Sequence, residues 1–319
     1  MISIIIPVFN SENTIETLVN NIAKVLGDAY QFEVILINDS SEDNSEKKCK
    51  LLVEKFSNVS LFSLSKNFGE HNAIMAGLNK CTGDYAVIMS DDLQHSADSL
   101  LELIKYGIEK KDNFDVIYTY YNKKKYNFFK NIGSKFNDIV ANFLLTKPKH
   151  LYLSSFKFIN RFLITEITKH QSPFVYIDGL ILGITNKIGR IKVEHNQRIH
   201  GKSGYTLIKM LQLWSNMSTS FSIFPLRLSL LMGSILSFIG FILAIIFFVE
   251  RLTDDTFPSG LASIFVSVTI FSGAILISVG LVGEYVGRVL ISLNKKPQFI
   301  IRNSFTNKKN DTIKSTKKS

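Results

Sequence analysis

The stretch YAVIMSDDLQ, at residues 85–94, joins a short apolar run to two adjacent carboxylates, Asp91 and Asp92. An apolar run without polar alternation is typical of a parallel strand that is covered on both faces. In open α/β sheets, ligands bind beyond the carboxyl ends of the strands. Two neighbouring acids repel each other unless a cation lies between them, and a hard divalent cation meets that need. The stretch therefore predicts that Asp92, with Asp91 and Gln94, holds a metal bound to a diphosphate. The alternative is a turn that only ends the strand.

Strand and helix patterns alternate on both sides of this stretch. Strand patterns occupy 2–6, 32–38, 59–64, 85–90 and 115–119, and helical patterns occupy 12–26, 70–80 and 98–109, with a further helix from Asp43. This alternation predicts a doubly wound, mostly parallel sheet. The turn at residues 7–12 contains no glycine, which argues against a Gly-x-Gly-x-x-Gly dinucleotide cradle.

The composition indicates a soluble domain joined to a few membrane spans. Apolar residues make up 46% of the 319-residue chain, and the mean hydropathy is +0.15. The net charge of +10 suits nucleic acid, anionic lipid or phosphorylated substrates. The first apolar stretch is short and lacks a basic flank, so we expect a strand and not a signal peptide, and a first domain in the cytoplasm. Cys49 and Cys81 are expected to be reduced core residues.

Two later segments have the pattern of membrane-surface helices. Between residues 122 and 145, lysines alternate with phenylalanines, as in a basic amphipathic helix at a membrane surface. The alternative is a helix that packs on the sheet and exposes a solvated lysine face. The segment 206–224 is also amphipathic, and it carries the chain's only tryptophan, Trp214, just before an apolar span.

Two apolar runs, 228–249 and 261–283, contain no charged residue. Each is long enough to cross a hydrocarbon core of about 30 Å. Arg227 and Arg288 flank the outer ends of the pair, whereas the loop between the runs has no net positive charge. The positive-inside rule therefore predicts a hairpin with both termini in the cytoplasm. The basic tail that follows is expected to be disordered beside an anionic leaflet.

Seven motifs occur in a fixed order along nearly the whole chain. They are IIIPVFNSE (4–12), INDSSED (37–43), NFGEH running on to Ala76 and Gly77 (67–77), TGD (82–84), DDLQ (91–94), Arg198 with GKSGY (201–205), and GEYVGR (283–288). In this order, with two apolar spans, the chain resembles glycosyltransferase family 2, in the branch of dolichyl-phosphate mannose synthase and bacterial undecaprenyl-phosphate sugar transferases. The resemblance implies a GT-A fold. It also implies inverting transfer of a sugar from a nucleotide diphosphate, UDP by analogy, to polyprenyl phosphate, for cell-envelope glycan synthesis or modification.

The resemblance also assigns site residues. The nucleotide sugar is expected at Pro7, Phe9, Glu12, Asp39, Lys66, Asn67 and Asp91; the acceptor phosphate at Arg198, Lys202 and Ser203; and Mg²⁺ or Mn²⁺ at Asp92 and Gln94. Asp39 would accept hydrogen bonds from the base, or else form an Asx turn after its strand. The basic loop would hold a phosphate through a forked arginine, a lysine and a hydroxyl, or else be a solvated loop. His71 is left open as a ligand or as a residue that starts a helix.

Two positions depart from the family pattern. The usual Asp-x-Asp-Leu-Gln has its first acid where this chain has Ser90, and Asp91, shifted by one, would point to the other side of a strand. A Gly-Asp-Phe-Arg segment aligns with residues 154–157, so Ser155 stands where an aspartate is the proposed catalytic base. A phosphate acceptor with a second pKa of about 6 is already deprotonated at neutral pH. Its oxygen therefore needs alignment and charge screening more than a base. Asp92, Asp91 and Ser155 remain the candidate catalytic positions.

The predicted organisation has five parts. They are a nucleotide-sugar-binding core (1–121), an acceptor-side extension (122–205), an interfacial helix (206–226), two transmembrane helices (227–290) and a basic cytoplasmic tail (291–319). We expect an inner-membrane protein with two spans, whose partners are a nucleotide diphosphate sugar, polyprenyl phosphate and the membrane, without nucleic acid. The family resemblance suggests a homo-oligomer.

Two alternative functions stay open. Ser90 and Ser155 prompt the hypothesis of a catalytically silent membrane scaffold. A processive polysaccharide synthase is the other, although such enzymes resemble a Gln-x-x-Arg-Trp pattern and Trp214 follows Leu213 here.

Overall fold

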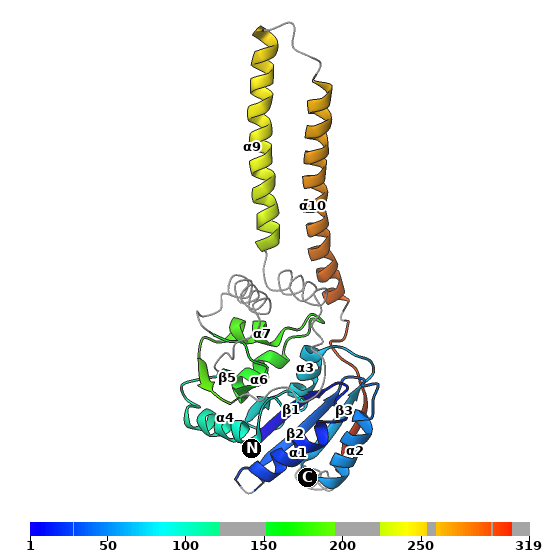
Figure 1. Cartoon of the computed structure of the whole chain (residues 1–319), viewed down its shortest axis with the longest axis vertical. Helices are drawn as coiled ribbons and strands as arrows, with labels where there is room; N and C mark the ends of the chain where they lie inside the picture. Colours follow the sequence, from blue (N-terminus) through cyan, green and yellow to red (C-terminus); the bar gives the residue numbers. More distant parts are fainter. Residues whose placement is uncertain (28, 121–150, 195–223, 254–259, 295, 308–319) are drawn as a thin grey trace, which may run out of the picture. The chain divides into compact units, whose positions relative to one another are not determined.

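The computed structural model describes residues 1–27, 29–120, 151–194, 224–253, 260–294 and 296–307 (Figure 1). The chain divides into two compact units. One contains residues 1–206 and 295–319, and the other contains residues 207–294. The predicted surface helices at 122–145 and 206–224 lie outside the described residues.

The first unit is built on one mixed sheet with the strand order β7-β5-β6-β4-β1-β2-β3-β8. The strands are β1 (Ile2–Val8), β2 (Phe32–Asn38), β3 (Val59–Leu64), β4 (Tyr85–Ile88), β5 (Val116–Tyr120), β6 (Lys157–Asn160), β7 (Ile188–Lys192) and β8 (Ile301–Thr306). Parallel pairs join β1 to β2 and β4, β2 to β3, and β5 to β7. Antiparallel pairs join β6 to β4 and β5, and β8 to β3. The predicted mostly parallel sheet is therefore parallel at its centre and mixed as a whole.

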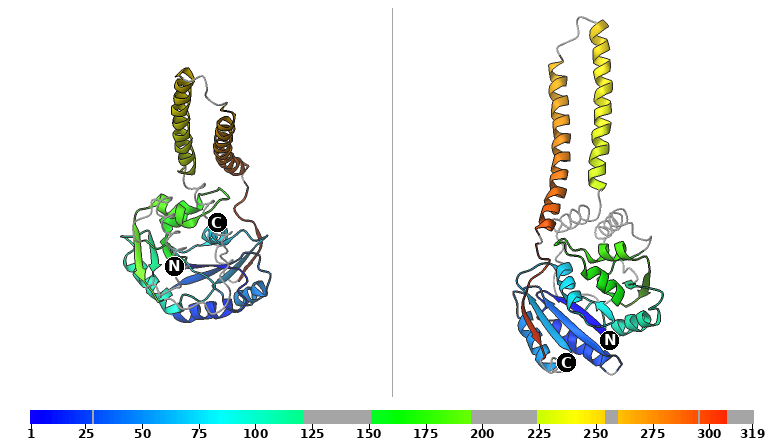
Figure 2. Two further views of the ribbon diagram at one scale, coloured as in Figure 1. Left: turned by 45° about the horizontal axis from the view of Figure 1, so that its top comes forward. Right: turned by 180° about the vertical axis from the view of Figure 1, so that it is seen from behind.

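Helices cover both faces of this sheet (Figure 2). The cluster on one face includes residues of α1 (Ile15–Leu26), α2 (Ser45–Lys55) and α4 (Ala97–Glu109). The other face carries α3 (Glu70–Lys80), α6 (Arg161–Thr168) and α7 (Ile177–Ile184). Along β1, Ile4 and Ile6 enter the first cluster and Ile5 enters the second, which explains the uninterrupted apolar run. Gly77 lets α3 approach β1, because a β-carbon there would collide with Ile5.

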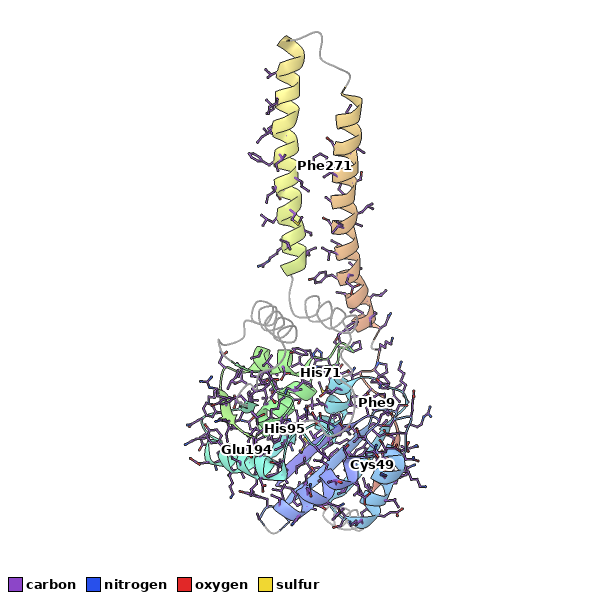
Figure 3. All side chains as sticks on the ribbon, viewed as in Figure 1. Phe9, Cys49, His71, His95, Glu194 and Phe271 are labelled. Carbon is purple, nitrogen blue, oxygen red and sulfur yellow. The ribbon has the colours of Figure 1, made fainter. Side chains whose placement is uncertain are left out.

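The second unit contains two long helices, α9 (Phe224–Thr253) and α10 (Leu261–Leu293). In α10, the run Ile270–Ile291 is long and apolar enough to cross a membrane; in α9, the apolar run is shorter and covers Leu226–Ile242. The ring of Phe271 packs against Gly240 of the partner helix (Figure 3). Within the described residues, one candidate span is thus established, and the predicted second span remains a prediction.

Two strands were not anticipated. Residues 157–160 form β6 between β4 and β5, although the segment 154–170 has the pattern of a loop followed by a helix. A four-residue strand that begins with a lysine is too short for a clear periodicity.

The tail was also predicted to be disordered throughout, and this is wrong for residues 301–306, which form β8. Their hydrophobic pattern is weak. The strand is held by edge pairing with β3 and by hydrogen bonds of the residues that precede it in the chain. Ser65 N donates to Ile300 O at 2.9 Å, and Gln298 Nε2 donates to Ser172 O at 2.9 Å. The lysine-rich residues 308–319 lie outside the described part of the chain.

Candidate active site

The carboxyl ends of β1, β2 and β4 meet at one edge of the sheet. β1 pairs in parallel with both neighbours, so the turns after the three strands are adjacent. Among the described residues, the non-glycine residues with positive φ are Asn10 (54°), Ser40 (59°) and Leu93 (59°), one in each of these turns. Such backbone costs about 1–3 kcal/mol per residue and clusters at functional sites. This edge is therefore the best-supported candidate site.

Asp91 turns towards β1. Its Oδ2 accepts a hydrogen bond from Phe9 N at 3.1 Å and another from the Ser11 hydroxyl. Burial raises the pKa of Asp91, the nearby charge of Asp92 adds to this, and the two hydrogen bonds oppose it. Asp91 lies beyond β4, which ends at Ile88, so the predicted alternation along a strand does not extend to this side chain.

Asp92 and Gln94 are close together in the turn after β4. Asp92 is 9% exposed, and its Oδ1 accepts a hydrogen bond from Gln94 N at 3.2 Å. The predicted metal ligands therefore form an Asx-type turn. A turn that ends the strand, which was the alternative to a metal site, is thus also present. No group of three or more His, Cys, Asp or Glu side chains converges within the described residues. Because Mg²⁺ is commonly bound by one or two carboxylates plus substrate phosphates, the residues fit a cation shared with a diphosphate and not a protein-only cage.

Asp39 holds the backbone that starts α3. It is 3% exposed; its Oδ1 accepts from Phe68 N at 2.7 Å and its Oδ2 from Gly69 N at 2.8 Å. Burial raises the pKa of Asp39, while these two hydrogen bonds act against the rise. The carboxylate thus fixes the turn that follows Lys66 and Asn67, both of which are exposed. Its predicted contact with a base stays a prediction.

The remaining residues predicted to bind the nucleotide sugar differ in exposure and in the hydrogen bonds that their side chains make within the protein. Phe9 presents a ring that is 46% exposed (Figure 3). Glu12 Oε2 accepts hydrogen bonds from Asn44 N at 3.1 Å and Asn44 Nδ2 at 3.0 Å, so it ties the turn after β1 to the start of α2. Pro7 lies within β1 and is half-buried. Of these residues, Phe9 is the one placed to stack on a planar base.

Ser90 and Ser155 contact each other, with their hydroxyl oxygens 3.2 Å apart. The two departures from the family pattern therefore meet in space. Near them, Lys157 is 2% exposed and its ammonium pairs with Asp178, which also accepts a hydrogen bond from Tyr118 Oη at 2.8 Å.

Four further polar residues belong to this region and were missed or left open. They are Glu70, His71, Lys157 and Asp178. Glu70 is exposed at the surface, yet neighbouring protein atoms desolvate its carboxylate and raise its pKa. The charge of Lys157 lowers this pKa, and the charges of Asp91, Asp178 and Asp92 raise it. The motif NFGEH contains Glu70 and could have suggested it, whereas nothing local marks Asp178.

His71 is nearly enclosed by its neighbours. Its Nδ1 is buried and has no hydrogen-bond partner among the residues that the structure describes, and its ring meets Tyr176 edge-on at a centroid distance of 4.9 Å. Burial lowers the pKa of His71 to about 4, with Lys157 adding to the effect and Asp178 opposing it. His71 is therefore neutral at pH 7.

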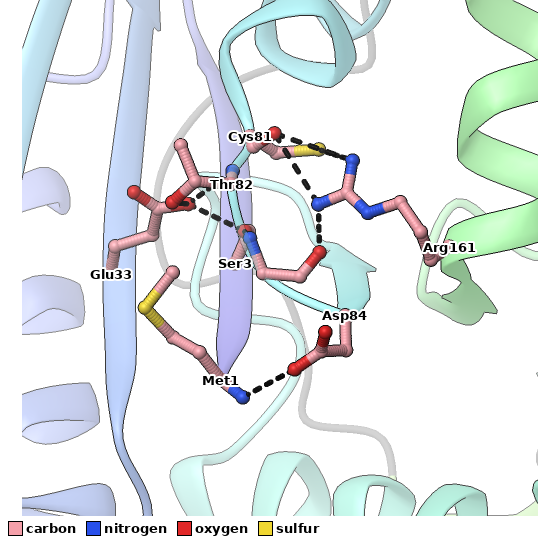
Figure 4. A network of polar contacts seen from close by, with 8 residues as sticks. Met1, Ser3, Glu33, Cys81, Thr82, Asp84 and Arg161 are labelled. Carbon is pink, nitrogen blue, oxygen red and sulfur yellow. Dashed lines mark hydrogen bonds and ion pairs between the residues drawn. The ribbon is translucent and has the colours of Figure 1, made fainter. Parts of the chain in front are cut away.

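The TGD motif lies at the opposite end of the strands (Figure 4). The Met1 ammonium pairs with Asp84 Oδ2 at 2.8 Å, Arg161 donates to Gly83 O, and a β-carbon on Gly83 would collide with Ser3. This motif has a structural role. The predicted acceptor residues Arg198, Lys202 and Ser203 lie outside the described residues, and their role stays a prediction.

Solved structures share this fold. Glucosyl-3-phosphoglycerate synthase of M. tuberculosis superposes with a TM-score of 0.52 at 16% identity, covering 69% of this chain and 78% of that one. The same enzyme in complex with Mn²⁺ and UDP-glucose gives a TM-score of 0.50 at 17% identity, covering 69% and 77%. At this identity the similarity shows the fold alone, and it supports the predicted GT-A-type α/β domain.

Sequence relatives match over nearly their full length. The undecaprenyl-phosphate 4-deoxy-4-formamido-L-arabinose transferase of Proteus mirabilis (strain HI4320) is 28% identical over 313 residues, covering 94% of this chain and 93% of that protein. The protein of the same name from Pseudomonas fluorescens (strain SBW25) is 28% identical over 310 residues, covering 96% and 90%. The glycosyl transferase family 2 model matches residues 3–168, just over half of the chain. The chain therefore belongs to glycosyl transferase family 2 and is a glycosyltransferase.

Proposed function

We propose that this glycosyltransferase moves a sugar from a nucleotide diphosphate, UDP by preference, to polyprenyl phosphate at a membrane, with inversion and a divalent cation. The observation that carries the proposal is the combination, in one chain, of the Asp92 strand-end site with the apolar helix α10. A water-soluble donor and a lipid acceptor require both parts. The relatives named above are undecaprenyl-phosphate transferases, and each aligns with more than nine-tenths of this chain.

The described residues suggest how the donor is held. The exposed ring of Phe9 stacks on the base, and the Asp39 carboxylate keeps Lys66 and Asn67 beside it through the amides of the following turn. Asp92 and Gln94 hold Mg²⁺ or Mn²⁺ together with the diphosphate. The bound cation supplies Lewis-acid stabilisation of the departing diphosphate.

The acceptor side needs no strong base. A phosphate monoester with a second pKa of about 6 is largely dianionic at neutral pH, so Ser155 suffices where a carboxylate is expected in the family. The described residues are proposed to orient the phosphate oxygen in line with the anomeric carbon, and Arg198, Lys202 and Ser203 to screen its charge.

Strand β8 supports the proposal of two spans. It belongs to the same sheet as β1–β7 although it follows α10 in the chain. The chain leaves this unit before α9 and returns to it after α10, so the number of membrane crossings in between is even. If the run Ile270–Ile291 crosses, α9 must cross as well. The flanking Arg227 and Arg288 then favour a cytoplasmic catalytic unit.

The test uses the full chain purified in detergent with undecaprenyl phosphate and a panel of radiolabelled UDP-, GDP- and dTDP-sugars. We expect label in an organic-extractable lipid, with loss on addition of EDTA. Asp92→Ala should abolish the product, whereas the exposed Asp98→Ala in α4 is the matched carboxylate control. An active Asp92→Ala variant would refute the assigned site. The absence of any lipid product across the panel would favour the silent scaffold, and a long polysaccharide product the processive synthase.

A further inference from the structure

The segment between α10 and β8 contacts the turn after β3. We call this segment, residues 296–300, the strap. β8 pairs antiparallel with β3, and a hydrogen bond from Ser65 N to Ile300 O, at 2.9 Å, continues this pairing past the end of β3. Ser65 directly precedes Lys66 and Asn67, the exposed pair that is proposed to lie beside the donor. The strap therefore reaches the first residue of this turn.

The turn itself, residues 65–69, is held at both ends, and we call it the donor loop. Its first amide bonds to the strap, and its last two amides bond to the carboxylate of Asp39 at 2.7 and 2.8 Å. Lys66 and Asn67 lie between these two anchors, and both are exposed. A loop that is already fixed in position pays less ordering entropy when a ligand binds. The anchors therefore favour binding by the two exposed side chains.

Gln298 fixes the strap to the rest of the catalytic unit. Its half-buried carboxamide donates from Nε2 to two backbone carbonyls after α6, His170 O at 2.5 Å and Ser172 O at 2.9 Å. Gln298 is two residues before Ile300, whose carbonyl accepts the hydrogen bond of the donor loop. Loss of the carboxamide contacts would therefore release the strap close to the point where it anchors that loop.

A second route connects the same carboxamide to the other end of the donor loop. The segment after α6 leads to Tyr176, whose ring meets His71 edge-on at a centroid distance of 4.9 Å. His71 is the second residue of α3, the helix that begins where the donor loop ends. In addition, Phe299 of the strap and Phe68 of the donor loop pack against the same hydrophobic cluster. The contacts that start at Gln298 thus reach the donor loop at its start and at its end.

We propose that Gln298 is a positioning residue for donor binding, which acts through the strap to hold Lys66 and Asn67 at the nucleotide sugar. The inference rests on the proposed function, which puts these two residues beside the donor. It implies that the donor site is completed by residues that the chain supplies only after α10. The alternative is a purely structural role, in which the strap only leads into β8 and helps to cover the edge of β3.

The first experiment measures the affinity of the full chain in detergent for UDP, GDP and dTDP with Mn²⁺ by calorimetry. Gln298→Met keeps a similar side-chain volume and removes both donated hydrogen bonds. We expect the affinity for the preferred diphosphate to fall about fivefold to tenfold, the equivalent of one hydrogen bond. Asn307→Leu is the matched control, because Asn307 Nδ2 donates to Val53 O at 3.4 Å beyond the other end of β8. An unchanged affinity in Gln298→Met, or an equal loss in the control, would overturn the inference.

A mutant cycle tests whether Gln298 acts through the donor loop. Gln298→Met should cost affinity in the wild-type chain and nothing in a chain that already carries Lys66→Ala and Asn67→Ala. Additive losses would contradict the proposed route. Hydrogen exchange gives a local readout: the amides of residues 65–69 should exchange faster in Gln298→Met and at the wild-type rate in Asn307→Leu. A lower melting temperature with unchanged affinity and unchanged exchange in this loop would show the purely structural role.

The outcomes separate this inference from the proposed function. If the wild-type chain binds none of the three diphosphates, the proposed function fails and the inference fails with it. If Lys66→Ala with Asn67→Ala weakens binding but Gln298→Met does not, the inference alone is wrong. Should Gln298→Met not fold, Gln298→Asn decides, because its amide is one methylene too short to keep both hydrogen bonds; wild-type affinity in that variant would overturn the inference.

Discussion

The buried pair of Lys157 and Asp178 is predicted to be far more sensitive to one substitution than to two. The side chains are 3% and 9% exposed, and their charges are in direct contact. Asp178→Asn removes the negative charge and leaves the buried ammonium without its direct ion-pair partner, which costs about 3–5 kcal/mol. For a unit of this size the melting temperature should fall by about 6–20 °C. Lys157→Met should cost less, because Asp178 keeps the hydroxyl of Tyr118 at 2.8 Å.

The assay is thermal unfolding of the full chain in detergent, followed by circular dichroism and by proteolysis. The double variant Lys157→Met with Asp178→Leu should recover most of the stability, since apolar side chains of similar volume often replace a buried ion pair at little cost. The surface pair of Lys169 and Glu166 has side chains 64% and 33% exposed. Its variant Glu166→Gln should therefore cost less than about 1 kcal/mol. A loss below about 1 kcal/mol in Asp178→Asn, or a double variant as unstable as the sum of the singles, would refute the reasoning.

Three further predictions concern the site and the edge of the sheet. Phe9→Ala should weaken binding of the nucleoside diphosphate by about 1–3 kcal/mol, the range for one base stacked on an aromatic ring, as measured by calorimetry; unchanged affinity would place the base elsewhere. The pKa of His71 is about 4 in the folded chain and 6.5 as the ordinary value, so the unfolded chain binds the proton first as pH falls. About 3 kcal/mol of stability should therefore be lost from pH 6.5 to 4, and His71→Gln should flatten this part of the unfolding profile relative to wild type. Deleting residues 300–319 removes β8 and uncovers the edge of β3, so the truncated chain should unfold at lower temperature and aggregate; an unchanged melting curve would show that β8 contributes nothing.

Local sequence patterns determined much of this molecule. The apolar runs of β1 to β5 and the stripes of α1, α3 and α4 could be read directly, because each pattern reflects burial against a nearby layer with a fixed period. The placement of Asp92 at a strand end followed from the same reasoning.

Long-range pairing decided the rest. β6 and β8 carry weak periodic signals and exist because neighbouring strands offer unpaired hydrogen-bonding groups. Asp39 was expected to bind the base; that its oxygens also hold the amides of Phe68 and Gly69, some thirty residues away, could not be read from the sequence. Ser90 and Ser155 looked like two separate losses, and only the antiparallel register of β4 and β6 made them one contact. Such contacts depend on which strands become neighbours in the sheet, and no local period in the sequence records that choice.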